Sequence, residues 1–236
     1  NHAYQIHELA KNDLKTWFSQ VLTVDDTKAI PRDVLEQERR EIIRLNGDDA
    51  LYQQEYFCSF TVPLAGAYYA NQIQLAYAEG RVGNVPYEDR IPVDTWWDLG
   101  INDLMAIWFT QSVGAELRLI DYYQATGEGL PHYAGMLKER GYVYGTHNAP
   151  HDIVVKELGT GKSRLEAAKL LGIKFRIVPR VGLMDGIDCT RSMFRKCWFD
   201  AKKCEVGLNA LKNYRKEYDD QRKTFLDHPY HDWTSN

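Results

Sequence analysis

Apolar and polar residues alternate most regularly near the middle of the chain. Three runs, at 93–98, 104–111 and 116–125, have the two-residue period of half-buried strands, and Gly100 and Gly114 stand where the chain would turn between them. We therefore predict three consecutive antiparallel strands, which would form the centre of a sheet.

Downstream of these strands, the apolar positions recur with the period of helices and strands in turn. The predicted elements are, in order, a helix at 130–140, a strand at 142–148, a helix at 162–171, a strand at 174–179, and closing helices at 184–199 and 206–222. This order, βββαβαβα, is typical of the ribonuclease H-like fold. We predict an α/β domain whose mixed β-sheet is flanked by helices.

The first 55 residues have a different pattern and carry no motif with recognisable chemistry. Short alternating runs at 3–9 and 17–24 predict strands, and a charged amphipathic helix follows them. A further alternating run at 54–60 predicts a strand. We expect an N-terminal appendage at 1–55 and the main domain at 56–236.

The composition narrows the class of protein. With 236 residues, of which 44% are hydrophobic, the chain can bury a full core. No run approaches the roughly 18 apolar residues of a membrane span, and the polar start is not a signal peptide. We expect a soluble intracellular protein and, because the sequence does not begin with Met, a piece of a longer chain.

The four cysteines lack the spacing of zinc sites or of a disulfide frame. Any metal site would therefore use oxygen ligands, which favours Mg²⁺ or Mn²⁺.

Two carboxylates stand at the ends of predicted strands. Asp98 ends the first strand of the central three, and Asp152 follows the fourth strand. In this topology the two strands are parallel neighbours, so their carboxyl ends converge at one edge of the sheet. Two divalent cations about 3.5–4 Å apart, held by three or four carboxylates, promote phosphodiester hydrolysis. Asp98 and Asp152 are the candidate shared ligands; the alternative is that both cap turns.

Further metal ligands are expected near these two. Asp103 is a candidate auxiliary ligand in the turn after the first strand. The C-terminal segment offers Asp227 and Asp232, of which we favour Asp232, because burial of the adjacent Trp233 would direct its carboxylate inward. His151 is a general acid, a metal ligand or a packing residue.

Positive charge is concentrated in one part of the chain, although the net charge is -4. Residues 153–223 carry 17 Lys and Arg against 9 Asp and Glu, which leaves 12 against 24 elsewhere, or formal charges of +8 and -12. Such a segment is expected to contact phosphates, the alternative being solvated helix faces. Lys156, Lys162 and Arg164 are the candidate DNA-binding residues. The loop at 159–163 lacks the first glycine of a nucleotide-binding loop.

Five short motifs span nearly the whole chain. They are Gln54–Phe60, Gly66–Tyr69, Trp97–Gly100 with Asp103, Pro150–Asp152 and His231–Ser235. In this collinear order they resemble the nuclease half of the large terminase subunit of tailed double-stranded DNA bacteriophages. Members of that family join an N-terminal packaging ATPase to a C-terminal ribonuclease H-like endonuclease. The resemblance implies that 1–55 is the end of the ATPase domain with its linker, and that 56–236 is the nuclease domain, without ATPase activity of its own.

The resemblance also implies a function. It is that of a metal-dependent, largely sequence-non-specific DNA endonuclease that cuts concatemeric genome DNA by two-metal hydrolysis. Asp98, Asp152 and Asp232 would bind two Mg²⁺ or Mn²⁺ ions, with Asp103 as an auxiliary ligand. The implied partners are double-stranded DNA, the phage portal and the small terminase subunit, in the host cytoplasm during virion assembly and without a membrane. The alternatives are a catalytically silent DNA-gripping or portal-docking module, and another ribonuclease H-like nuclease of the resolvase or transposase type.

Overall fold

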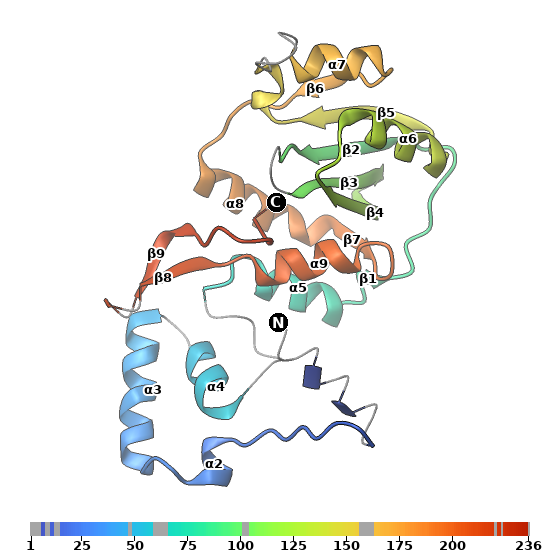
Figure 1. The fold of residues 1–236 in the computed structure, drawn as a ribbon. Helices are drawn as coiled ribbons and strands as arrows, with labels where there is room; N and C mark the ends of the chain where they lie inside the picture. The colour runs from blue at the N-terminus through green and yellow to red at the C-terminus, as the bar shows by residue number, and fades with distance from the viewer. Residues whose placement is uncertain are drawn as a thin grey trace. The chain divides into compact units, whose positions relative to one another are not determined.

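The computed structural model describes residues 6–7, 10–11, 15–46, 49–58, 66–100, 104–155, 163–219, 221–222 and 224–235. The chain forms two compact units, shown as ribbons in Figure 1. Unit 1 comprises residues 1–68 and 213–230, and unit 2 comprises residues 69–212 and 231–236. Within the described ranges, no helix is both long and apolar enough to cross a bilayer.

A seven-stranded mixed sheet is the centre of unit 2 (Figure 1). Its strands, in chain order, are β1 (Val82–Gly83), β2 (Val93–Asp98), β3 (Leu104–Val113), β4 (Glu116–Thr126), β5 (Tyr144–Ala149), β6 (Phe175–Ile177) and β7 (Cys197–Asp200). In space they follow the order β1-β7-β4-β3-β2-β5-β6. Strands β2, β3 and β4 are antiparallel, and every other neighbouring pair is parallel. The predicted mixed α/β sheet is confirmed.

Helices of unit 2 begin and end where local chemistry requires. They are α5 (Ala70–Ala78), α6 (Leu130–Arg140), η1 (His151–Val154), α7 (Arg164–Leu170), α8 (Leu183–Met193), η2 (Phe194–Lys196) and α9 (Glu205–Asn213). Helix α6 ends at Gly141, whose φ of 66° is the left-handed conformation that glycine adopts without strain. At the start of α7, Ser163 and Glu166 form a reciprocal capping box, which satisfies two backbone N–H groups.

Both faces of the sheet are covered, by different helices. On one face, Trp97 and Ile107 join Tyr133 of α6 and Ala168 of α7 in the main hydrophobic core. On the other face, α9 lies so close to β3 that a Cβ at Gly207 would be 2.5 Å from the Trp108 ring. Glycine at this position therefore permits the helix to approach the sheet.

Unit 1 combines the N-terminal helices with a β-hairpin from the C-terminal region. Its elements are α2 (Val24–Thr27), α3 (Arg32–Asn46), α4 (Ala50–Phe57), β8 (Lys216–Asp219) and β9 (Thr224–Pro229). A small core of Val24, Leu35, Ile42 and Tyr52 holds the three helices together. The predicted domain boundary between residues 55 and 56 stays a prediction. The two compact units are defined by contacts within the fold, which do not show where one domain ends and the next begins.

Several predicted elements in unit 1 are wrong. Ile6 and His7, in the predicted strand at 3–9, are helical. Residues 17–23 form no strand, and Thr23 instead caps α2 through a capping box with Asp26. A strand was also predicted at 54–60. Residues 54–57 instead form the last turn of α4.

The two predicted closing helices are shorter than expected. The range 184–199 contains α8, then η2, and ends in strand β7, while α9 ends at Asn213 and the chain then enters the β8–β9 hairpin. Strand β7 has only four residues, CWFD, whose apolar run is indistinguishable from the last turn of an amphipathic helix.

Candidate metal centre

The carboxyl ends of β2 and β5 bring Asp98 and Asp152 together. Strand β2 pairs with β5 in parallel, with Trp96 opposite Asn148, so both strands end at the same edge of the sheet. Asp98 is the last residue of β2, and Asp152 lies in η1, directly after β5. The convergence that strand order predicted is therefore present.

Electrostatics shows that the two carboxylates interact. Asp98 is exposed at the surface, yet the protein atoms around it remove part of its hydration, and this desolvation is the first cause of its raised pKa. The negative charge of Asp152 raises the pKa of Asp98 further, while a hydrogen bond from the Leu99 backbone opposes the shift. The charge of Asp98 also reaches Tyr122, whose pKa burial and this charge raise to about 12.

No cation of the described residues neutralises this carboxylate pair. The ion pairs of the described ranges include neither Asp98 nor Asp152. Two adjacent carboxylates repel one another unless a proton or a cation is shared between them, and carboxylate oxygens are the ligands that Mg²⁺ and Mn²⁺ prefer. The pair therefore fits a divalent cation.

Asp232, the expected third ligand, lies in unit 2 with the other two, and the hydrogen bonds described for its side chain are to a neighbouring residue. Its Oδ1 accepts hydrogen bonds from the backbone N–H of Thr234 at 2.9 Å and from the Thr234 hydroxyl at 2.5 Å. Trp233 is 49% exposed, so the predicted burial of this side chain is wrong, and Thr234 is the buried residue of the segment. Within the described ranges, no group of three His, Cys, Asp or Glu side chains is close enough to hold a metal.

Asp227, the alternative third ligand, belongs to the other unit. It lies on β9, 93% of its side chain is exposed, and Lys216 forms an ion pair with it at 2.9 Å. Its pKa is lowered by the hydrogen bond from Lys216 and by the charge of Lys216. The expectation that Asp227 is extended and exposed is confirmed, and Asp232 remains the candidate for the third ligand.

The other residues predicted from sequence are only partly visible. Asp103, Lys156 and Lys162 lie outside the described residues. Arg164 is the first residue of α7, and its Nη1 donates a hydrogen bond of 3.5 Å to the backbone oxygen of Leu99, the residue after Asp98. His151 is exposed at the start of η1.

The four cysteines are free thiols, and two of them are buried. Burial raises the pKa of Cys197 to about 11 and that of Cys204 to about 12. Both are therefore protonated at neutral pH, in which form a thiol is a poor metal ligand. Their placement agrees with the expectation that the metal chemistry uses oxygen ligands.

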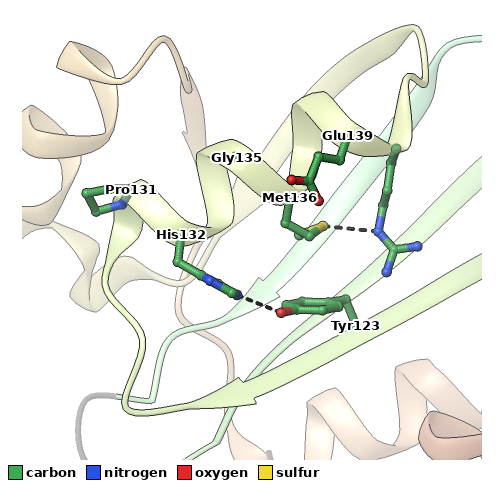
Figure 2. Close-up of a pocket in the computed structure, with 7 residues that line it drawn as sticks. Tyr123, Pro131, His132, Gly135, Met136 and Glu139 are labelled. Carbon is green, nitrogen blue, oxygen red and sulfur yellow. Dashed lines mark hydrogen bonds between the residues drawn. The ribbon is translucent and has the colours of Figure 1, made fainter.

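A separate surface hollow of about 400 Å³ lies beside α6 (Figure 2). Tyr123, whose hydroxyl is 2.6 Å from Nε2 of His132, forms one wall of it. Successive side chains of a strand point to opposite faces of the sheet. Because Tyr122 faces Asp98, Tyr123 faces the other side, and this hollow is not part of the carboxylate site.

Two residues near the site were missed at the sequence level. Asn148 of β5 is 1% exposed, and Arg176 of β6 donates a hydrogen bond from Nε to its Oδ1 at 2.8 Å. Asparagine in a strand carries little signal by itself. The pair becomes visible only once the register aligns β5 with β6.

Comparison with known proteins places this fold. Neither a protein-family model nor a curated protein sequence matches the chain. Among solved structures, the large terminase of a thermophilic bacteriophage matches with a TM-score of 0.53 and 15% identity, over 97% of this chain and 55% of its own. The nuclease domain of the P22 large terminase has a TM-score of 0.47 and 15% identity, over 64% of this chain and 81% of its own. The large terminase nuclease of the thermophilic phage G20c with bound magnesium has a TM-score of 0.47 and 14% identity, over 73% of this chain and 94% of its own.

The first of these matches extends over nearly all of the present chain, which spans about half the length of that large terminase. At this level of identity, the similarity concerns the fold. The chain therefore shares a mixed α/β fold with that large terminase, and the predicted mixed α/β fold class is confirmed.

Proposed function

We propose that this chain is a metal-dependent DNA endonuclease domain of a phage DNA-packaging terminase. The observation that carries the proposal is the pair of electrostatically coupled carboxylates, Asp98 and Asp152, at the ends of two parallel strands. The fold shared with the large terminase of a thermophilic bacteriophage supports it, as does the excess of Lys and Arg in residues 153–223. The substrate class is double-stranded DNA, cut largely without regard to sequence.

Each residue of the site has a proposed role. Asp98 and Asp152 hold the metal, because their mutual repulsion is relieved when a cation lies between them. Asp232 supplies the third carboxylate, with Asp103 as an auxiliary ligand. When bound, two Mg²⁺ or Mn²⁺ ions supply activation of water and stabilisation of the departing oxygen in phosphodiester hydrolysis. Lys156, Lys162 and Arg164 contact the phosphates of the DNA.

The biological setting follows from the same proposal. The chain would act beside a packaging ATPase, whose last residues correspond to 1–55, and would cut concatemeric genome DNA in the host cytoplasm. The portal and the small terminase subunit are the proposed protein partners. Because the phosphate-binding motifs of an ATPase are absent, we expect no ATP hydrolysis from this chain.

A nicking assay on supercoiled plasmid tests the proposal. The chain is incubated with Mn²⁺, with Mg²⁺ or with EDTA, and products are followed over time. We expect metal-dependent nicks and linear DNA with ends at many positions, and none in EDTA or with the Asp98→Asn variant. Cleavage confined to branched DNA would favour a resolvase and contradict the terminase proposal.

The second candidate function is a catalytically silent DNA-gripping or portal-docking module. The observation in its favour is that the described residues contain no group of three metal-ligating side chains. Intact DNA binding without cleavage in either metal, at any concentration up to about 10 mM, where even weak sites fill, would support this module.

A further inference from the structure

We propose that Arg176, held in place by Asn148, binds a backbone phosphate of the DNA strand that is cut, next to the phosphate at which cleavage occurs. This inference rests on the proposed nuclease function and adds a contact residue to it. Neither residue belongs to the predicted set of DNA-binding residues.

The first argument is the position of the pair on the sheet. Trp96 pairs with Asn148, and Asn148 pairs with Arg176, so these three residues form one row across β2, β5 and β6. Because side chains alternate along a strand, Asp98, two residues after Trp96, lies on the same face as this row. Strand spacing of about 4.8 Å and a rise of about 3.3 Å per residue separate the Cα atoms of Arg176 and Asp98 by about 12 Å.

The second argument is how Arg176 is anchored. Its Nε donates to Oδ1 of Asn148 at 2.8 Å, and Nδ2 of Asn148 donates to the backbone oxygen of Thr95 at 3.1 Å. Asn148 is 1% exposed, and both ends of its amide are engaged, so its orientation is fixed. This bond holds the guanidinium over β5, between its own strand and the strand that carries Asp98.

The third argument is what Arg176 does not bind. Arg176 is exposed, and among the described residues it forms no ion pair with Asp98, Asp152 or any other carboxylate. A guanidinium has five N–H donors, and the described contacts use only Nε–H. The remaining donors form a planar fork that matches the oxygens of a phosphate. Trp96 is 39% exposed, so the face is open to a ligand at this row.

Distance then decides which phosphate is contacted. The Cα atoms of Arg176 and Asp98 are about 12 Å apart, so the Arg176 side chain is not expected to contact a phosphate bound between Asp98 and Asp152. It suits a neighbouring phosphate of the same strand. Such a contact is made equally in the bound substrate and in the transition state, so its loss should raise KM and leave kcat nearly unchanged.

The experiment compares Arg176→Gln, Arg176→Lys and a matched control. Binding of a fluorescent duplex is measured by anisotropy between about 50 and 200 mM salt, in the cleavage-deficient Asp98→Asn background. Arg176→Gln should weaken binding about tenfold and lower the salt slope by about 0.9, since one phosphate contact is lost. Arg176→Lys keeps the charge and should restore most of the slope. Arg90→Gln, an exposed arginine before β2 at the opposite end of that strand, should change neither quantity.

Asn148 is tested as a positioning residue. Asn148→Ala should weaken binding less than Arg176→Gln, and adding it to Arg176→Gln should have no further effect, because the two act through one contact. Thermal melts of each variant show whether the fold is intact, and Arg176→Gln is expected to melt like the parent because its side chain is exposed.

The outcomes separate this inference from the nuclease proposal. If the parent cleaves plasmid and Arg176→Gln binds DNA with unchanged affinity and salt slope, the phosphate contact is refuted and the nuclease stands. If the parent binds DNA without cleaving it and Arg176→Gln still lowers the slope, the contact stands and the nuclease fails. If Arg176→Gln and Arg90→Gln weaken binding equally, the effect is one of general charge, and the inference is refuted.

Discussion

Asp98 carries an electrostatic cost that a hydrogen bond from the Leu99 backbone relieves only in part. Its pKa is raised by desolvation and by Asp152, so the folded protein binds this proton more tightly than the unfolded chain does. Stability from this group is therefore greatest below its ordinary pKa of 3.8, falls as pH rises through the raised pKa, and is at its lowest at neutral pH. A cation between the carboxylates would remove the cost.

Neutralising Asp98 or Asp152 should lower the nuclease activity, and neutralising Asp98 should raise the stability of the metal-free protein. Asp98→Asn and Asp152→Asn are each expected to lower plasmid cleavage by at least about 100-fold, because an amide binds a divalent cation weakly. In EDTA at pH 7, Asp98→Asn should melt at a higher temperature than the parent, and added Mg²⁺ should narrow this gap by stabilising the parent.

The control is Asp89→Asn, an exposed carboxylate in the turn before β2. It should leave both cleavage and the melting temperature unchanged. Parental cleavage by Asp98→Asn would refute its assignment as a metal ligand, and a lower melting temperature in EDTA would refute the electrostatic argument.

His147 predicts a pH dependence of stability that is independent of the metal. Burial lowers its pKa from the ordinary 6.5, and its Nδ1 lies 2.7 Å from the Thr95 hydroxyl. The folded state thus binds this proton less tightly than the unfolded chain. The contribution is fully present above about pH 6.5 and is lost as pH falls through the lowered value. His147→Gln should flatten the decline of melting temperature between pH 7 and 5, and an unchanged decline would contradict this role.

At the scale of elements, one buried ion pair joins α6 to β4. Asp121 is 3% exposed and pairs with Arg140, while the Tyr142 hydroxyl donates to its Oδ2 at 3.1 Å. Arg140 also lies over the Phe109 ring, 4.9 Å from its centroid. Removing one partner of such a pair leaves the other charge desolvated, which costs more than the pair itself contributes.

Asp121→Ala should therefore destabilise unit 2 by about 3 kcal/mol, the lower end of the range for buried pairs, because Arg140 keeps some contact with water. Urea unfolding followed by tryptophan fluorescence measures the loss. Asp188→Ala is the matched control: it breaks an exposed pair with Arg191 on α8 and should cost about 0.5 kcal/mol or less. Equal losses in the two variants would show that burial of Asp121 contributes nothing special.

Elements with strong local signals were predictable, and those formed by tertiary contacts were not. The central strands and α6 follow from alternation, helical period and a glycine stop, which are properties of neighbouring residues. Strand β7 is held between β1 and β4, partners that are distant in sequence, so its four residues carry no separate signal. Strand β8 was missed for a different reason: its partner β9 is close in sequence, but β8 lies at the end of a stretch whose period predicted a helix.

The residues of the candidate site also divide into those that the sequence predicts and those that it does not. Asp98 and Asp152 were predictable because strand order alone places the ends of β2 and β5 together. The local contacts of Asp232 and the exposure of Trp233 were not, since neither depends on period or topology. The Asn148–Arg176 bond requires the register of two parallel strands, and no pattern along the chain predicts that register.

At the scale of the whole molecule, part of the positive charge of residues 153–223 is already engaged in ion pairs. Several cations of residues 153–223 already have partners: Lys216 pairs with Asp227, Arg191 with Asp188 and Arg222 with Asp219. The segment is also divided between the two units, because residues 213–223 belong to unit 1. Because a cation in an ion pair is less available to a phosphate, we expect the phosphate contacts to come from a subset of these residues.

Arg164 and Lys162 are the members of that subset that the sequence places next to the carboxylates. Arg164 begins α7 and contacts the backbone of Leu99, beside Asp98. The double variant Lys162→Glu/Arg164→Glu should weaken binding to unrelated duplexes by the same factor and lower the salt slope by about 2, as expected when two phosphate contacts are lost. Anisotropy titrations on three duplexes of different sequence measure both effects.

The control Arg90→Glu/Lys138→Glu makes the same change in net charge at exposed positions, one before β2 and one on α6 across the sheet from Asp98. An equal loss in the control would mean that binding follows net charge alone, and unchanged binding in the test variant would place the DNA path away from α7.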